Sequence, residues 1–349
     1  MKKNLLIIAL FPVLLSLSAC QGGEKKVEFQ FKLWNDCEAI TRLKDFVKKA
    51  TDKNSDGFVP VKDRIATFDM DGTIYGELYP TYLEYNMLVY RALEDESYDA
   101  PQDVIDAATA IKEHVEEGKA YPDKFELIHA NAAAKAYAGM SVKEFDTYVK
   151  NYLKTPAWGF ENMTYGEGFY KPMLEIFDYL EENDFTYYIV SGSDRAICRS
   201  LICDTLDIQP SQIIGMDVEY KAKNQGDTDG LDYVFDPKTD DVIRTEHLLI
   251  KNLKMNKIKQ INQDIGKQPI LSFGNSGGDC SMHNYALANP TYNSAAFMLI
   301  ANDEERDYGN TVKTEELGKT WKQNGYTVIS MKDDFKTIYG ENVVKKASN

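Results

Sequence analysis

The chain has 349 residues, which is long enough for one large domain or two ordinary ones with a buried core. Hydrophobic residues make up 43% and charged residues 27%, which excludes a wholly disordered chain and a collagen-like repeat. The formal net charge of −15 argues against a nucleic-acid-binding protein. Four scattered histidines argue against a histidine-built zinc site, so any metal site is expected to use oxygen ligands.

The first twenty residues have the pattern of an export signal. Two lysines precede the apolar stretch Leu5–Leu15, which is too short and too interrupted by proline to span a bilayer. The following Leu-Ser-Ala-Cys sequence resembles a bacterial lipobox ending at Cys20, although an ordinary secretory signal with a chance cysteine has the same outline. We expect residues 1–19 to be a lipoprotein signal peptide, Cys20 to carry lipid and residues 20–33 to form a tether. This predicts a lipid-anchored protein of the bacterial cell envelope, periplasmic or surface-exposed.

After the tether, the hydrophobic pattern alternates between helices and strands. A helix is predicted over residues 36–49, and a short apolar strand over residues 64–68 runs directly into Asp69. From residue 77 to about 153 the periodicity is helical only, and Ser141-Val-Lys-Glu144 has the form of a capping box. Further elements are predicted over residues 172–180, 187–190, 194–206, 258–265, 270–273, 297–300 and 327–331.

This order of elements predicts an α/β fold with a doubly wound parallel sheet. We expect residues 34–74 and 169–349 to form the α/β core. Residues 75–168 are expected to form an all-helical cap inserted after the first strand.

A possible calcium loop precedes that strand. Residues 52–63 nearly match an EF-hand loop, beginning at Asp52 and ending at Asp63. Pro60 at the ninth position, an aspartate at the twelfth and a strand in place of the second helix favour a polar helix-to-strand turn. Calcium binding by this loop is left open.

Polar motifs follow three of the predicted strands, and ligands bind at the carboxyl ends of the strands in open α/β sheets. A single aspartate after a strand is often only a helix cap or a turn residue. Three motifs in this order argue for a shared site. They are Asp69-Met-Asp71-Gly72-Thr73, Ser191-Gly192-Ser193 and Gly274-Asn275-Ser-Gly-Gly-Asp279.

Together with Lys257, these motifs resemble the four motifs of the haloacid-dehalogenase-like (HAD) hydrolase superfamily, in particular its phosphoserine-phosphatase-like branch. The likeness extends from about Trp34 to the C-terminus, and segments such as Trp34-Asn-Asp36 and Val328-Ile-Ser-Met-Lys332 resemble lipoprotein members of that branch. The resemblance implies a magnesium-dependent phosphomonoester hydrolase with a Rossmann-like core and a C1-type cap.

The residue types support the same chemistry. Asp69 fits a carboxylate nucleophile that forms an aspartyl-phosphate, and Asp71 fits a general acid and base. The Ser191 hydroxyl and the backbone N–H groups near Gly192 fit the phosphoryl oxygens. Lys257 is the candidate for neutralising the phosphate, with the nearby Lys254 as the alternative.

Magnesium is the expected cofactor, with Asp69 and the backbone carbonyl of Asp71 among its ligands. Many members of the superfamily carry aspartate where this chain has Asn275, whose amide oxygen ligates a cation with one less negative charge. Asp279 is the other candidate, either as a ligand or as the partner that orients Lys257.

Glu77 and Tyr75, near the start of the cap, are the candidates for substrate selectivity. In relatives that act on amino-group substrates, an acid at about this position contacts the ammonium group. Tyr75, Tyr79 and Tyr82 are candidates for an aromatic wall. Ordinary packing of the cap is the competing interpretation for all four residues.

These features predict a phosphomonoester hydrolase acting on a small phosphorylated metabolite, for example a phosphoserine- or phosphocholine-like ester. The expected partners are this substrate and, through the lipid on Cys20 alone, the membrane. The alternative is a non-enzymatic envelope lipoprotein that uses the fold to bind a ligand or a partner. The intact Asp69 and Asp71 pair favours the enzyme, because a binding module needs no such pair.

Overall fold

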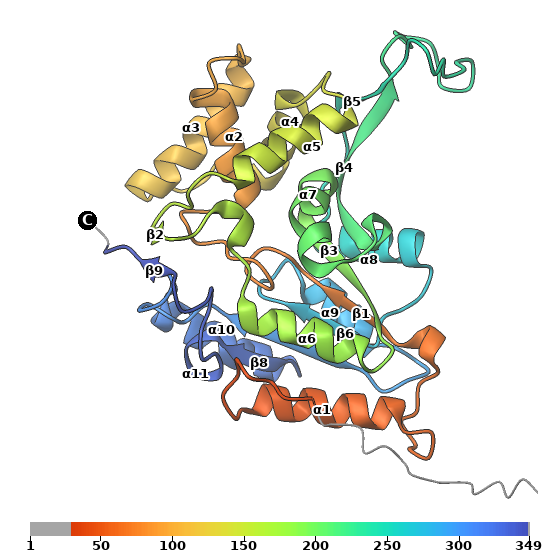
Figure 1. Cartoon of the computed structure of the whole chain (residues 1–349), viewed down its shortest axis with the longest axis vertical. Helices are drawn as coiled ribbons and strands as arrows, with labels where there is room; N and C mark the ends of the chain where they lie inside the picture. Colours follow the sequence, from red (N-terminus) through yellow and green to blue (C-terminus); the bar gives the residue numbers. More distant parts are fainter. Residues whose placement is uncertain (1–28, 348–349) are drawn as a thin grey trace, which may run out of the picture. The chain divides into compact units, whose positions relative to one another are not determined.

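The computed structural model describes residues 29–347, and the predicted signal peptide and lipidated Cys20 lie outside them. Within the described part of the chain, a seven-stranded sheet has the order β5-β4-β3-β1-β6-β7-β8 (Figure 1). All neighbouring strands are parallel except β4 and β5. The strands are β1 (Ile65–Phe68), β3 (Thr186–Asp194), β4 (Ile213–Ala222), β5 (Val242–Ile250), β6 (Leu271–Gly274), β7 (Ala295–Ile300) and β8 (Thr327–Ser330).

Two groups of helices accompany the sheet. The helices of the core are α1 (Glu38–Thr51), α6 (Lys171–Glu181), α7 (Arg195–Leu206), α8 (Met255–Gln260), α9 (Cys280–Leu287), α10 (Thr311–Gln323) and α11 (Met331–Asp334). Those between β1 and β3 gather together in Figure 1: α2 (Leu83–Leu93), α3 (Gln102–Glu117), α4 (Phe125–Ala136) and α5 (Val142–Leu153). The short strands β2 (Phe160–Glu161) and β9 (Val344–Lys345) pair separately. The predicted doubly wound α/β fold is confirmed.

A row of stacked aromatic rings packs at the centre of the sheet. The rings of Phe68, Phe273 and Phe297 stack across β1, β6 and β7, with centroids 4.4 and 4.8 Å apart. Phe177 of α6 packs on Phe68 at 4.4 Å and covers this face. On the opposite face, β7 alternates to Met298, which packs against Trp321 of α10. Burial on both faces explains why these strands consist mainly of apolar residues.

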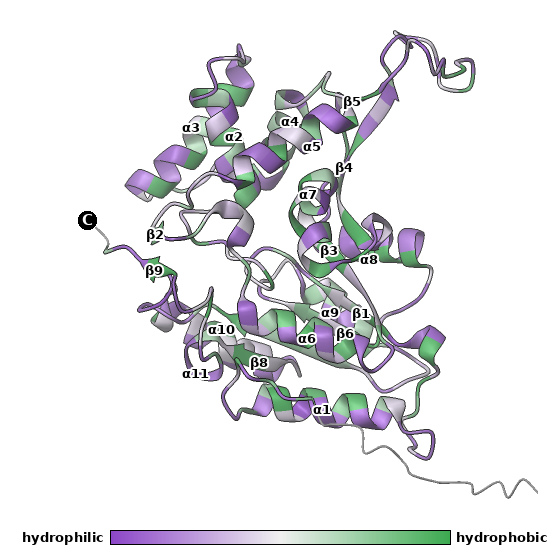
Figure 2. Ribbon diagram, viewed as in Figure 1, coloured by the Kyte–Doolittle hydropathy of each residue, from purple (hydrophilic) through white to green (hydrophobic). Residues whose placement is uncertain are grey.

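Local sequence signals position several helices. Ser141 and Glu144 make the predicted capping box at the start of α5. Figure 2 shows alternating hydrophilic and hydrophobic bands along α1 and α6, as expected for helices that bury one face. In the described part of the chain, no helix combines the length and apolar character that crossing a membrane requires.

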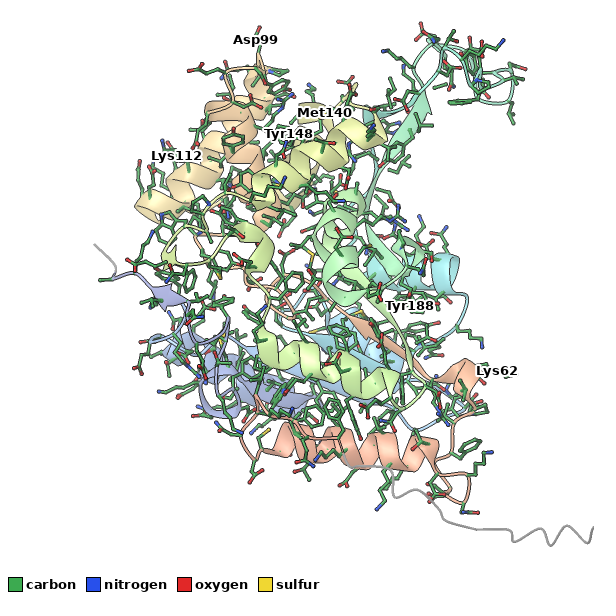
Figure 3. The ribbon with its side chains drawn as sticks, viewed as in Figure 1. Lys62, Asp99, Lys112, Met140, Tyr148 and Tyr188 are labelled. Atoms are coloured by element: carbon green, nitrogen blue, oxygen red, sulfur yellow. The ribbon has the colours of Figure 1, made fainter. Side chains whose placement is uncertain are left out.

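Our sequence analysis did not predict the antiparallel hairpin β4–β5. Its strand β5 bonds to the turn between α4 and α5: the Arg244 N–H donates to the carbonyl of Met140 at 2.9 Å (Met140 is labelled in Figure 3). The buried Arg244 guanidinium pairs with Asp194 at the end of β3 and lies 4.0 Å from the Phe145 ring of α5. The hairpin therefore ties the helical cap to the end of a core strand.

The EF-hand-like segment is a helix-to-strand turn. It leads from α1 through one 3₁₀ turn, Val61–Asp63, into β1. The carboxylate of Asp63 accepts hydrogen bonds from Lys267 at 2.7 Å and from the Tyr292 hydroxyl at 3.0 Å. These contacts give Asp63 a structural role in joining the turn to the core.

Asp307 is a fully buried carboxyl group that sets a pH dependence of stability. It accepts hydrogen bonds from the Tyr339 hydroxyl and from the Tyr308 N–H, but burial outweighs them and raises its pKa to about 6. Because the folded state holds this proton more tightly than the unfolded state, the stabilisation is complete below the unfolded pKa of 3.8 and is lost as the pH rises through 6.

We therefore expect Asp307→Asn to flatten this dependence. Between pH 4 and pH 7 the wild-type free energy of unfolding should fall by on the order of 3 kcal/mol more than that of the variant. Urea unfolding at the two pH values measures the difference. Parallel pH curves for both proteins would contradict the assignment.

Candidate active site

The site lies at the carboxyl ends of the three central strands β3, β1 and β6. Asp69 follows β1 directly, and its N–H donates to the carbonyl of Phe273 at 2.9 Å, which fixes the start of the loop. The side chains of Asp69 and Asp71 are buried beneath the cap. The parallel pairing of β1 with both neighbours therefore brings the three predicted motifs together.

Lys257 lies between two of these motifs. Its buried ammonium group donates to Asp69 Oδ1 at 2.5 Å and to Asp279 Oδ1 at 2.7 Å. Lys254, the alternative candidate, is exposed and directly precedes the first residue of α8. The geometry selects Lys257 as the cation of the site.

Burial dominates the electrostatics of the two catalytic candidates. Burial and the nearby Asp279 raise the pKa of Asp69, while Lys257 opposes this increase. Burial also raises the pKa of Asp71 to about 6, although the Ser193 hydroxyl, which donates to Asp71 Oδ2 at 2.7 Å, lowers it. Burial alone would lower the pKa of Lys257, but Asp279 and Asp69 hold it above its ordinary value.

The Ser191-Gly192-Ser193 motif lies in the last part of β3, where the pairing with β4 is irregular, and not after a strand that ends at residue 190 as predicted. The hydroxyl oxygen of the fully buried Ser191 accepts the Ser193 N–H at 3.0 Å. A Cβ at Gly192 would lie 2.6 Å from Leu253 Cδ2, so a side chain there would require the end of the Leu253 side chain to move. Our sequence analysis quoted Ser193 only as part of the motif, yet Ser193 is the residue that contacts Asp71.

Asn275 and Glu77 meet above Gly72. Asn275 Nδ2 donates to Glu77 Oε1 at 3.0 Å. Gly72 has φ +76°, and a Cβ there would lie 1.9 Å from Asn275 Nδ2 and 2.6 Å from Glu77 Cδ. Only glycine fits this position, because any side chain would displace both groups.

The donor chemistry of this loop cluster suits a hard divalent cation. Asp71 Oδ1 is buried and has no hydrogen-bond partner, and Asp69, Asn275 and Glu77 add further carboxylate and amide oxygens. Among residues 29–347, no three His, Cys, Asp or Glu side chains are arranged to hold an ion by themselves. Amide, carbonyl or water oxygens would have to complete a magnesium site here, as is usual for this ion.

A groove of about 1370 Å³ is lined by residues of the cap, among them Glu77 and Tyr82, and by residues near the C-terminus such as Tyr308. Its walls carry many aromatic rings, among them the half-exposed Trp158, and charged groups such as Glu94 and Lys112 (Lys112 is labelled on α3 in Figure 3). The volume exceeds the roughly 300–1,000 Å³ of a typical small-molecule pocket.

The structure separates the three tyrosines that the sequence suggested for this wall. Tyr75 and Tyr79 are buried, and the Tyr75 hydroxyl donates to the Tyr165 carbonyl at 2.6 Å. Tyr82 lines the groove. Packing is therefore the role that the geometry gives to Tyr75 and Tyr79.

A second buried charge pair borders the site. Lys251, in the loop after β5, lies 3.4 Å from the buried Glu84 carboxylate of α2. This contact joins core and cap beside Asp71, whose pKa Lys251 lowers. Our sequence analysis missed it because the two residues are 167 positions apart.

No protein-family model and no curated protein matches the chain. Among solved structures, it is similar to a conserved functionally unknown protein from Anaerococcus prevotii DSM 20548, at 14% identity and TM-score 0.50, over 86% of this chain and 93% of that chain. It is also similar to cytosolic 5'-nucleotidase IIIB bound to cytidine, at 10% identity and TM-score 0.48, over 86% of each chain.

A third similar structure is the HAD family hydrolase t0658 from Salmonella enterica serovar Typhi, at 14% identity and TM-score 0.41, over 78% of this chain and 69% of that chain. The likeness to the Anaerococcus protein shows a shared fold. The two structures with TM-scores below 0.5 are too distant to add to that conclusion.

Proposed function

We propose that this protein is a magnesium-dependent phosphomonoester hydrolase of the HAD superfamily, anchored in the cell envelope through Cys20. The observation that carries the proposal is the buried Asp69, placed beside Asp71 and bonded to Lys257 at 2.5 Å. A carboxylate nucleophile, a neighbouring carboxyl group and a buried cation are the groups that transfer of a phosphoryl group requires.

Asp69 is the nucleophile in this mechanism. Its carboxylate attacks the phosphorus atom, the bond to the leaving oxygen breaks, and an aspartyl-phosphate forms. Lys257 holds one Asp69 oxygen and its ammonium charge offsets the negative charge of the phosphoryl group. Ser191, Gly192 and the adjoining backbone N–H groups are proposed to contact the phosphoryl oxygens.

Asp71 moves the protons. With a pKa of about 6, it is protonated in a useful fraction of molecules near neutral pH and donates that proton to the leaving oxygen. The resulting carboxylate then takes a proton from the water that hydrolyses the aspartyl-phosphate. The Ser193 hydroxyl, at 2.7 Å, orients Asp71 through both steps.

Asp69, the Asp71 carbonyl and Asn275 are the residues proposed to hold magnesium. The bound ion would supply positive charge that favours the ionised form of Asp69 and neutralises the substrate. Asp279 is proposed as the residue that orients Lys257, because one of its oxygens accepts from Lys257 and the other from the N–H groups of Asn275 and Ser276.

The groove is proposed to hold the alcohol part of the substrate. A phosphoserine- or phosphocholine-like ester is proposed to bind with its alcohol part beside Glu77 and Tyr82, which line the groove, and the groove also has room for a larger leaving group. The test is hydrolysis of an aryl phosphate with and without magnesium. A panel of phosphoamino acids, phosphocholine, sugar phosphates and nucleotides then identifies the leaving group. If the purified protein hydrolyses none of these esters, the non-enzymatic lipoprotein is the better interpretation.

Replacing Asp71 with asparagine should separate substrates by their leaving groups. We expect the rate with an alkyl phosphate to fall by about 10²–10⁴-fold, because general acid catalysis typically contributes that much. The rate with nitrophenyl phosphate should fall far less, since nitrophenolate leaves without a proton. Steady-state kinetics on both substrates measure this, and equal losses would assign Asp71 a purely positional role.

A further inference from the structure

Asn275 leaves the proposed metal site short of negative charge. Its side chain is neutral, and it occupies the end of β6 next to the loop that carries Asp69. Magnesium in proteins is usually held by one or two carboxylates together with water or substrate oxygens. With Asn275 as it stands, Asp69 is the one carboxylate among the three groups proposed to hold the ion.

Asp279 does not make up this deficit. Its Oδ1 accepts from Lys257 at 2.7 Å. Its Oδ2 accepts from the backbone N–H groups of Asn275 and Ser276 at 3.1 and 3.0 Å, and from the Ser276 hydroxyl at 3.2 Å. Both oxygens are therefore engaged in holding Lys257 and the loop.

Glu77 is the carboxylate that faces Asn275. Its Oε1 accepts from Asn275 Nδ2 at 3.0 Å, and both side chains lie over the backbone of Gly72, the residue that follows Asp71. Within residues 29–347, Glu77 forms no ion pair with a lysine or an arginine. A half-buried carboxylate beside Asp69 and Asp71 is destabilised by burial and by repulsion from these two carboxylates, and a bound cation would relieve that repulsion.

We propose that Glu77 supplies the metal site with the negative charge that Asn275 lacks, so that the divalent cation is held between the Asp69 loop and the Glu77–Asn275 pair. The proposal rests on the proposed magnesium-dependent function. In this proposal Glu77 binds the metal ion, whereas the sequence suggested that it contacts the substrate. Its hydrogen bond to Asn275 keeps the carboxylate over the loop, and Gly72 leaves room for both.

Calorimetric titration of the substrate-free protein with Mg²⁺ tests this without any turnover. Glu77→Gln should weaken magnesium binding by at least about tenfold, and Asn275→Asp should tighten it. The double variant, Glu77→Gln with Asn275→Asp, restores the number of carboxylates and should bind within about threefold of wild type. Glu94→Gln, which removes a carboxylate from the same groove away from the site, is the matched control and should bind like wild type.

Two results would overturn the proposal. One is magnesium binding by Glu77→Gln within twofold of wild type, with a higher KM for amino-bearing phosphoesters only, which would place Glu77 against the substrate. The other is a double variant that binds magnesium no better than Glu77→Gln, which would show that the two positions do not share the cation. Circular dichroism checks that each variant is folded. A wild-type protein that binds magnesium but hydrolyses no phosphoester would instead contradict the proposed function.

Discussion

Replacement of Asp69 by asparagine is expected to reduce turnover by at least about a thousandfold, which corresponds to about 4 kcal/mol in the activation free energy. The amide nitrogen and oxygen are poor nucleophiles toward phosphorus, so no aspartyl-phosphate forms. The fold should persist, because asparagine has nearly the same shape and its oxygen still accepts the hydrogen bond from Lys257.

Steady-state hydrolysis of nitrophenyl phosphate in the presence of magnesium measures this effect, and thermal unfolding of the variant provides the control for folding. Turnover within tenfold of wild type, about 1.4 kcal/mol, would rule out covalent catalysis by Asp69. A trapped phosphoenzyme in the wild type that is missing in the variant would locate the covalent bond directly.

The fold could be predicted where local patterns carry the information. The run Ile65–Phe68 is buried on both faces of the sheet, so it is mainly apolar, and it is followed directly by the polar Asp69. The capping box at Ser141 marks a helix start from four residues alone. Strand β5 has four charged or polar residues in a row at its centre, Arg-Thr-Glu-His, and its stability comes from pairing with β4 and from the buried Arg244. No local sequence pattern predicts such a strand.

In the candidate site, too, the local motifs could be predicted but the contacts between distant residues could not. The spacing of Asp69 and Asp71, and the glycine-rich motif around Asn275, are visible in the sequence because each lies within a few residues of a strand end. The contacts between these motifs cannot be read from the sequence. Ser193 reaches Asp71 across 122 residues, and Lys257 reaches Asp69 across 188. Tertiary packing of α8 buries Lys257 in the site and leaves Lys254, just before the helix, exposed, so the choice between them cannot be made from the sequence.

Lys257→Met is expected to destabilise the protein by about 3–5 kcal/mol as well as to abolish turnover, because two buried carboxylates lose the cation that they share. Methionine has a similar length, so the change removes the charge with little loss of volume. Urea unfolding in EDTA measures the effect on the metal-free protein. The loss should be largest at pH 8, where the buried carboxylates of the folded variant are hardest to neutralise by protonation.

The pH dependence of this loss identifies its cause. Without Lys257, the already raised pKa of Asp69 rises further, and the pKa of Asp279, which Lys257 holds below its ordinary value, rises as well. Stability is therefore lost as the pH rises and returns as the carboxylates protonate. The difference between Lys257→Met and wild type should therefore shrink between pH 8 and pH 5. Adding Asp279→Asn to Lys257→Met removes one of the two unpaired charges and should recover part of the stability at pH 8. An equal loss at both pH values, with no recovery in the double variant, would mean that Lys257 contributes packing rather than charge.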